Sequence, residues 1–186
     1  MAMPELSSRK SNGHINMNWD EYFVAIAELV CFRSKDRSTK VGAVIVGPDN
    51  EIRSTGYNSF VRGIDDHLEE RHERPAKYEW TEHAERNAIY NAARHGCALK
   101  GCTMYLNWGS FPCADCARGI IQSGITQVVM TDIPFGGSRG EGGIDWNENC
   151  GIGGHMLRES GIKVIHLHQI DTKAKLRALM AASHDK

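Results

Sequence analysis

Two short motifs, each at the start of a predicted helix, constrain this chain more than any other feature. The sequence HAE occupies residues 83–85 and PCADC occupies residues 112–116, with a predicted strand at 102–107 between them. Zinc prefers nitrogen and thiolate ligands in tetrahedral geometry, and a catalytic zinc site takes three of them from the protein and leaves the fourth position to water. His83, Cys113 and Cys116 supply three such ligands, so the sequence predicts one bound Zn²⁺.

The spacing of the two cysteines suits thiolate ligands. At a helix N-terminus both sulfurs lie near free backbone N–H groups and the positive end of the helix dipole, which favour the ionised form. Pro112 is compatible with this position because the first helical N–H has no intrahelical partner. Zinc held there would lower the pKa of a bound water from about 15.7 toward roughly 7. Hydroxide would then be available at neutral pH.

Glu85 follows His83 by two positions, which on an ideal helix turns its side chain by about 200° around the axis. We therefore do not expect it to coordinate the same metal. At a helix entrance its carboxylate can still lie beside the water and a substrate ring. There it could take the proton of the water, protonate a ring nitrogen and finally protonate a departing amine. Glu85 is the predicted catalytic residue.

A structural zinc ion, or two buried thiols in the core, would explain the CxxC motif alone. The upstream HAE motif, the proline before the first cysteine and the alternation of strands and helices favour a catalytic site instead. The remaining cysteines are interpreted as ordinary thiols. A second metal site built from Cys150 and His155 is conceivable, but no further histidine or carboxylate cluster completes it.

The residues before the first predicted helix, 1–17, are polar and without periodicity, which indicates a mobile tail. A chain of 186 residues is long enough for one domain and short for two, so 18–186 is expected to form a single domain. Asn18 and Glu21 have the spacing of a capping box. The elements expected in the first half are a helix at 18–33, a hairpin of strands at 41–46 and 51–57, a long loop at 59–80, and a helix at 81–94 capped by Thr81 and ended by Gly96.

The second half alternates strands and helices. The elements expected there are strands at 102–107, 127–131 and 163–167, a helix opened by Pro112, a Gly-rich connection at 136–154, a short helix at 155–160 and a last helix from Thr172. Such alternation is typical of a layered α/β domain whose later strands are parallel.

Charge and hydropathy exclude some classes of function. The formal net charge of −1 gives no general positive field, which argues against a polynucleotide substrate. No apolar run approaches the length of a membrane span. The polar start has no signal-peptide core, so we expect a cytoplasmic protein.

From about Trp19 to Leu167 the chain resembles the deoxycytidylate (dCMP) deaminases of the cytidine and deoxycytidylate deaminase superfamily. The HAE and PCxxC motifs match the signature of zinc deaminases. In addition RSKD at 33–36, VGA at 41–43 and GYN at 56–58 are similar to segments of the dCMP deaminases. The resemblance implies a three-layer α/β fold with a five-stranded mixed sheet and helices on both faces. It also implies zinc-dependent hydrolysis of dCMP to dUMP and ammonia, and a homo-oligomer.

Several residues become candidate substrate contacts through this resemblance. Arg and Lys side chains can bind a 5′-phosphate, and the amide of Asn58 suits a sugar hydroxyl. Aromatic rings near the cysteines could stack on the base, or could equally be core or oligomer contacts. The candidate phosphate contacts are Arg33, Ser34, Lys35 and Lys40, and Arg94 is a candidate for the phosphate or for an effector site. Trp108 and Phe111 are the candidates around the base, and Ala84 is a further candidate for contact with the substrate.

Two departures from the family pattern leave other substrates open. Ser59-Phe60-Val61 replaces the usual Gly and Pro after GYN, so regulation by nucleoside triphosphates is not assumed. The link at 106–111 before the cysteines is longer than usual, which would suit a different or larger base. The alternatives are a deaminase of another nucleoside, free base or aminoheterocycle, a tRNA or polynucleotide deaminase, and a zinc-stabilised binding module without catalysis.

Overall fold

A computed structural model describes residues 17–131 and 145–167 of the chain. Its centre is a mixed sheet with the strand order β2-β1-β5-β6-β7. β1 is antiparallel to β2 and to β5, whereas β5, β6 and β7 are parallel to one another. The predicted hairpin and the predicted parallel strands are thereby confirmed. The strand bounds are β1 (Gly42–Val46), β2 (Ile52–Tyr57), β5 (Thr103–Leu106), β6 (Gln127–Thr131) and β7 (Lys163–Leu167).

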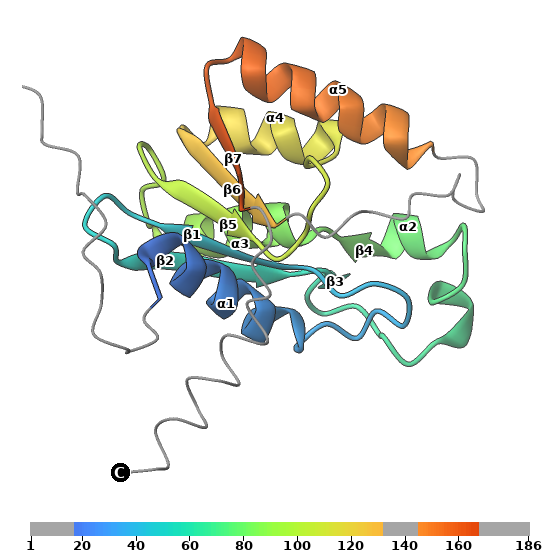
Figure 1. Ribbon diagram of the computed structural model, residues 1–186. Helices are drawn as coiled ribbons and strands as arrows, with labels where there is room; N and C mark the ends of the chain where they lie inside the picture. Colours follow the sequence, from blue (N-terminus) through green and yellow to red (C-terminus); the bar gives the residue numbers. More distant parts are fainter. Residues whose placement is uncertain (1–16, 132–144, 168–186) are drawn as a thin grey trace, which may run out of the picture.

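Helices cover both faces of this sheet (Figure 1). α1 (Trp19–Cys31) packs on one face, and α3 (Ala84–His95), α4 (Ala114–Gln122) and α5 (Trp146–Glu159) lie on the other. Successive strand residues point to opposite faces, so they divide between two cores. On β1, Val44 packs toward α1, while Ala43 and Ile45 pack toward the other three helices. The predicted three-layer α/β fold is confirmed.

The start of α1 agrees with the sequence pattern. The side chain of Asn18 accepts a hydrogen bond from the backbone N–H of Glu21, and the carboxylate of Glu21 accepts one from the backbone N–H of Asn18. This reciprocal pair satisfies two helix N–H groups that have no intrahelical partner.

Two helix starts differ from the expectation, and the difference matters for the site. Thr81 does not cap α3; it lies in the short strand β4 (Thr81–Glu82), and His83 is the N-cap residue. Pro112 stands one residue before Cys113, which is the N-cap of α4. His83 and Cys113, two of the three potential metal ligands, therefore each occupy a junction where an extended segment turns into a helix.

The segment at 59–80, expected to be a loop, contains small regular elements. β3 (Ser59–Phe60) pairs with β4 in a separate two-stranded sheet, and a 3₁₀ turn η1 (Glu69–Arg71) and the short helix α2 (Lys77–Trp80) lie between them in sequence. A buried ion pair between Lys77 and Asp36, 2.8 Å long, fastens this segment to the chain that follows α1.

The predicted first residue of α5 was wrong. The helix begins at Trp146 rather than near residue 155, because the side chain of Asp145 accepts hydrogen bonds from the backbone N–H groups of Asn147 and Glu148. The glycines at 151, 153 and 154 lie within the helix. Gly153 and Gly154 are buried because α5 packs closely there.

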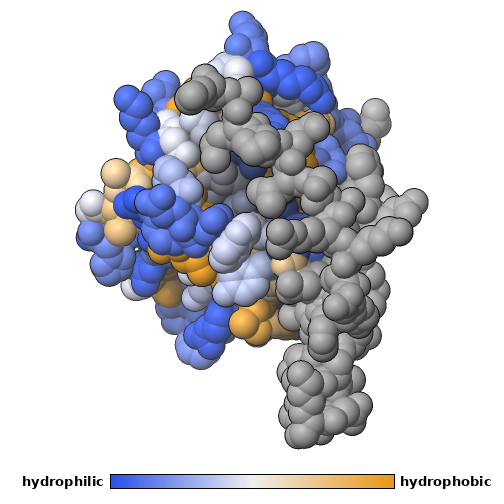
Figure 2. Space-filling view, turned by 60° about the vertical axis from the view of Figure 1, so that its left-hand side comes forward, coloured by the Kyte–Doolittle hydropathy of each residue, from blue (hydrophilic) through white to orange (hydrophobic). Residues whose placement is uncertain are grey.

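Some predicted features fall outside the described residues: most of the N-terminal tail, part of the Gly-rich connection and the last helix from Thr172. Within the described part, no helix is both long and apolar enough to cross a membrane. Figure 2 shows one face of the molecule, on which hydrophilic residues prevail and hydrophobic ones form separate small patches.

Candidate metal centre and active site

His83, Cys113 and Cys116 come together where α3 and α4 begin. The Nδ1 atom of His83 lies 3.5 Å from the Sγ atom of each cysteine, and the three ligand atoms lie within 4.8 Å of one another. Tetrahedral bonds of roughly 2.0–2.3 Å would separate neighbouring ligand atoms by about 3.3–3.8 Å. One nitrogen and two sulfurs at these separations fit a zinc ion. Among the described residues this is the single cluster that could hold a metal.

Packing between α3 and β2 fixes the start of α3. Ala84 and Ala88 are fully buried, and a Cβ atom at Gly56 of β2 would lie 2.3 Å from the backbone nitrogen of Ala88. The helix can approach the strand this closely only because residue 56 has no side chain. The methyl group of Ala84 is therefore part of the core. The predicted contact of Ala84 with substrate stays a prediction, and it could involve only the backbone of this residue.

Hydrogen bonds within the cluster shift the acidity of its members in opposite directions. The bond with Cys116 lowers the pKa of Cys113 to about 3, so this sulfur is a thiolate at neutral pH. The same bond, together with burial, raises the pKa of Cys116 well above its usual range. Burial lowers the pKa of His83, but the bond with Cys113 and the charge of Glu85 outweigh it and leave the pKa raised. The cluster therefore binds protons that a cation would displace.

Glu85 lies beside the cluster without belonging to it. Its side chain is buried, with 7% exposed, and it interacts electrostatically with His83 and Cys113. Among the described residues, the possible metal ligands that lie close together are His83, Cys113 and Cys116, and the carboxylate of Glu85 is not one of them. Burial raises the pKa of Glu85 above its ordinary value. A carboxyl group in this position can accept or donate a proton next to a bound cation.

Arg86 is a site residue that the sequence reasoning missed. Its guanidinium donates to the sulfur of Cys116 over 3.6 Å and to the carboxylate of Glu82 over 2.6 Å. The nitrogen that faces Cys116, Nη1, also lies 3.7 Å from a carboxylate oxygen of Asp115. The signal was present in the spacing of Glu82 and Arg86, which places opposite charges one helical turn apart.

α5 also reaches the cluster. The ring of Trp146 lies 5.7 Å from that of His83 and 5.6 Å from that of Tyr78, measured between centroids. The amide oxygen of Asn149 accepts a hydrogen bond from the backbone N–H of Ala114, next to Cys113. No sequence motif pointed to these residues.

Most of the polar residues predicted to bind the sugar and phosphate form hydrogen bonds with backbone groups of the segment that follows α1. The hydroxyl of Ser34, a buried residue, donates to the backbone oxygen of Asn58, and Lys40 donates to the backbone oxygen of Ser34. The amide of Asn58 accepts from the backbone N–H of Val41 and donates to the backbone oxygen of Thr39. Their contacts with substrate stay predictions.

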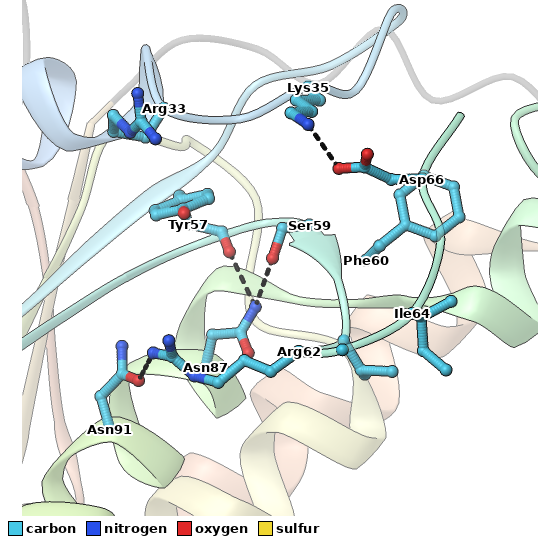
Figure 3. Close-up of a pocket in the computed structure, with 12 residues that line it drawn as sticks. Arg33, Lys35, Tyr57, Ser59, Phe60, Arg62, Ile64, Asp66, Asn87 and Asn91 are labelled. Carbon is cyan, nitrogen blue, oxygen red and sulfur yellow. Dashed lines mark hydrogen bonds and ion pairs between the residues drawn. The ribbon is translucent and has the colours of Figure 1, made fainter.

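Arg33 and Lys35 line a cavity of about 240 Å³ at the end of β2 (Figure 3). Lys35 forms an ion pair of 2.6 Å with Asp66, which lines the same cavity. None of the cluster residues lines it, but Asn87 does. The backbone N–H of Asn87 donates to the backbone oxygen of His83, so this lining residue lies one turn of α3 from the cluster residue His83.

Phe111 and Trp108 have packing contacts with the core, and Arg94 lies at the far end of α3 from the cluster. The ring of Phe111 packs between α5 and β7, 5.5 Å from the ring of His166 and 4.6 Å from the guanidinium carbon of Arg158. Trp108 packs against the core between the sheet and α3, α4 and α5. These positions favour the core alternative for both aromatic residues. Arg94 is exposed in the last turn of α3, roughly 16 Å along the helix from His83.

Sequence comparisons agree with the geometry. The family model described as the cytidine and deoxycytidylate deaminase zinc-binding region matches residues 17–132. The chain is 40% identical over 133 residues to the mouse deoxycytidylate deaminase, covering 69% of this chain and 71% of the relative. It is 32% identical to the deoxycytidylate deaminase of enterobacteria phage T2, covering 78% of this chain and 90% of the relative.

Solved structures agree on the fold. The dCMP deaminase from the cyanophage S-TIM5, in complex with dCMP and dUMP, superposes with a TM-score of 0.62 at 24% identity. The match covers 83% of this chain and all (100%) of that chain. With the family model spanning most of the chain and both ligand motifs in place, this chain belongs to the cytidine and deoxycytidylate deaminase family.

Proposed function

We propose that this protein hydrolyses dCMP to dUMP and ammonia, with zinc held by His83, Cys113 and Cys116. The observation that carries the proposal is the buried carboxyl group of Glu85 beside a cluster of one nitrogen and two sulfur ligands. Relatives about 40% identical that are named deoxycytidylate deaminase support this choice of substrate.

The reaction adds water to the ring carbon that bears the amino group and releases that group as ammonia. Zinc, when bound, would supply Lewis acidity that makes water a better nucleophile near neutral pH. Glu85 would take one proton from the water and pass it to the neighbouring ring nitrogen. It would then transfer the second proton to the departing amino group, so the carboxylate ends as it began. Its burial excludes bulk water from these transfers.

We further propose that Arg33, with Lys35, binds the 5′-phosphate. Arg33 forms no ion pair within the described part of the chain, and both side chains line the cavity whose residue Asn87 lies one turn of α3 from His83. Charge-assisted bonds from guanidinium groups to phosphate oxygens are strong and directional. The same ring chemistry would act on another aminoheterocycle. The long link at 106–111 supports that alternative, because it would suit a different or larger base.

Side-by-side assays of purified protein on dCMP, deoxycytidine, cytosine and a short oligonucleotide test the proposal. We expect dCMP to be deaminated fastest. A preference for cytosine or for the oligonucleotide would replace dCMP with a free base or a polynucleotide as substrate. A protein that binds zinc and deaminates none of the four would contradict the proposed reaction on all cytosine substrates.

Three broader expectations accompany this function. We propose a single domain over 18–186, a homo-oligomer in solution and a cytoplasmic location. The oligomer is inferred from the family resemblance, and sedimentation at micromolar concentration tests it. A monomer alone would contradict it.

A further inference from the structure

The first residue of α5 places an aromatic ring beside His83, one of the three cluster residues. The ring of Trp146 is tilted by 42° to that of His83 and stands at 61° to that of Tyr78. Trp146 and Tyr78 come from elements other than those that hold the cluster. Both side chains are half-buried, so each retains surface for a further contact.

Hydrogen bonds at both ends of the first turn hold Trp146 in this place. Asp145 caps the helix through the backbone N–H groups of Asn147 and Glu148, at 3.0 and 3.1 Å. Asn149 accepts from the backbone N–H of Ala114 at 2.9 Å, which ties the first turn of α5 to the first turn of α4. These bonds fix the backbone on both sides of the residue that carries the indole.

Two glycines let α5 approach the cysteine segment. A Cβ atom at residue 153 would lie 2.0 Å from the backbone oxygen of Pro112, and one at residue 154 would lie 2.9 Å from the ring of Phe111. Any side chain at Gly153 would therefore push the helix away. The close approach brings the first two turns of α5 beside the ligand Cys113.

Cys150, one turn after Trp146, continues the same surface. Its thiol hydrogen-bonds Ser110 and interacts electrostatically with Cys113 and Glu85. Burial raises the pKa of Cys150 to about 11, so the group is a neutral thiol at physiological pH. Next to the cluster, α5 thus presents an aromatic ring and a neutral, weakly polar group.

We propose that Trp146 is the side chain on which the substrate ring stacks, so that α5 favours binding of a flat heterocycle beside the cluster. The inference rests on the proposed function and adds a residue that determines specificity. Aromatic side chains stack on nucleobases without reading their hydrogen-bonding edges. Trp146 would therefore set affinity for the ring, while the phosphate contact would be made elsewhere.

The first test is steady-state kinetics of zinc-loaded Trp146→Ala, Trp146→Phe and the control Trp19→Phe, whose residue lies on α1 across the sheet. We expect Trp146→Ala to raise KM for dCMP about 10- to 100-fold with kcat changed less than about threefold. Trp19→Phe should stay near the parent, and Trp146→Phe, which keeps an aromatic ring, should recover most of the affinity that Trp146→Ala loses. An unchanged KM in Trp146→Ala would overturn the inference. Loss of zinc in Trp146→Ala would also overturn it, because the indole would then serve to position His83.

The second test needs no turnover. In a Glu85→Gln background, tryptophan emission is titrated with dCMP, deoxycytidine and cytosine. Ligand should quench emission in that parent and in Trp19→Phe, and most of the quenching should disappear in Trp146→Phe. Quenching that persists in Trp146→Phe would overturn the inference. A wild-type protein that deaminates no cytosine compound would contradict the proposed function, yet this titration would still decide whether Trp146 meets the ring.

Discussion

The guanidinium of Arg86 lies 3.6 Å from the sulfur of Cys116. The same guanidinium donates to the carboxylate of Glu82 and lies 3.7 Å from that of Asp115. A positive charge fixed beside a sulfur favours its ionised form, which is the form that binds a metal. Arg86 thus connects the start of α3 to the first turn of α4 and supports the cluster without being a ligand.

Replacing Arg86 by Met should weaken zinc binding while preserving the packing of its aliphatic part. Removing a group that orients or polarises a metal ligand typically costs about 10- to 100-fold in metal affinity. Competition with a chromogenic chelator measures this. Arg118→Met is the matched control, since Arg118 is exposed on the same helix as Cys116 and pairs with Asp115. Equal zinc affinities of Arg86→Met and Arg118→Met would contradict the proposal that Arg86 supports zinc binding.

Substitution of a ligand should have a larger effect. Cys113→Ala leaves two protein ligands, which should not retain zinc tightly. Metal analysis after dialysis should find less than about a tenth of the parent zinc content. Cys97→Ala serves as control because Cys97 lies after α3, outside the cluster. Full zinc content in Cys113→Ala would refute the assigned site.

Glu85→Gln should keep zinc and fold but lose most turnover. The amide fills the same volume and cannot shuttle protons, so kcat should fall by about 10²- to 10⁴-fold. Glu79→Gln, an exposed position on α2, is the control for loss of a carboxylate. Zinc content and circular dichroism should match the parent in both variants. Full activity of Glu85→Gln would eliminate the proposed proton transfers.

The metal centre was predictable from sequence because it depends on local rules. A histidine at the start of one helix and two cysteines at the start of another form the site once these two helix starts lie close together, and the HAE and PCxxC motifs mark both starts in the sequence. The start of α1 was equally local, since Asn18 and Glu21 satisfy each other. Strands β6 and β7 agreed with their predicted bounds because both are short β-branched segments between turns.

The other parts of the fold and of the site depend on tertiary contacts that no local sequence pattern predicts. The glycines at 151, 153 and 154 predicted a connection between elements. In the structure they lie within α5, and Gly153 and Gly154 allow this helix to approach Pro112 and Phe111. The contact between Trp146 and His83 joins residues far apart in the chain, and no spacing rule relates them. The two-residue strands β3 and β4 are likewise defined by their pairing with each other rather than by composition.

The buried ion pair between Asp36 and Lys77 predicts a dependence of stability on pH. Burial raises the pKa of Asp36, but hydrogen bonds from Lys77 and from the backbone N–H groups of Thr39 and Ser38 outweigh it and leave the pKa lowered. A lowered pKa means that the pair stabilises the fold above the unfolded pKa of about 4, and that this contribution is lost as pH falls through the folded value.

Asp36→Asn should accordingly cost roughly 3 kcal/mol near pH 7, because Lys77 remains buried without a counter-charge. Urea unfolding at several pH values measures this, and the difference from the parent should shrink toward acid pH. Lys35→Met breaks the more exposed pair with Asp66 and should cost about 0–1 kcal/mol. A pH-independent difference for Asp36→Asn would contradict the electrostatic origin.

The last prediction concerns the phosphate. If Arg33 binds it, dCMP should be deaminated about 10- to 150-fold better than deoxycytidine, which corresponds to the roughly 1.5–3 kcal/mol of a charge-assisted hydrogen bond. Arg33→Ala should remove most of that preference and leave the slow reaction with deoxycytidine nearly unchanged. The measurement is kcat/KM for both substrates in both proteins.

Arg62→Ala is the matched control for Arg33→Ala, because Arg62 lines the same cavity but already donates to the side chain of Asn91. It should lose less of the preference for dCMP than Arg33→Ala. Equal losses on both substrates in Arg33→Ala would mean that Arg33 supports the fold. A parent without any preference for dCMP would instead indicate a free base or another aminoheterocycle, because the phosphate would then contribute nothing to the transition state.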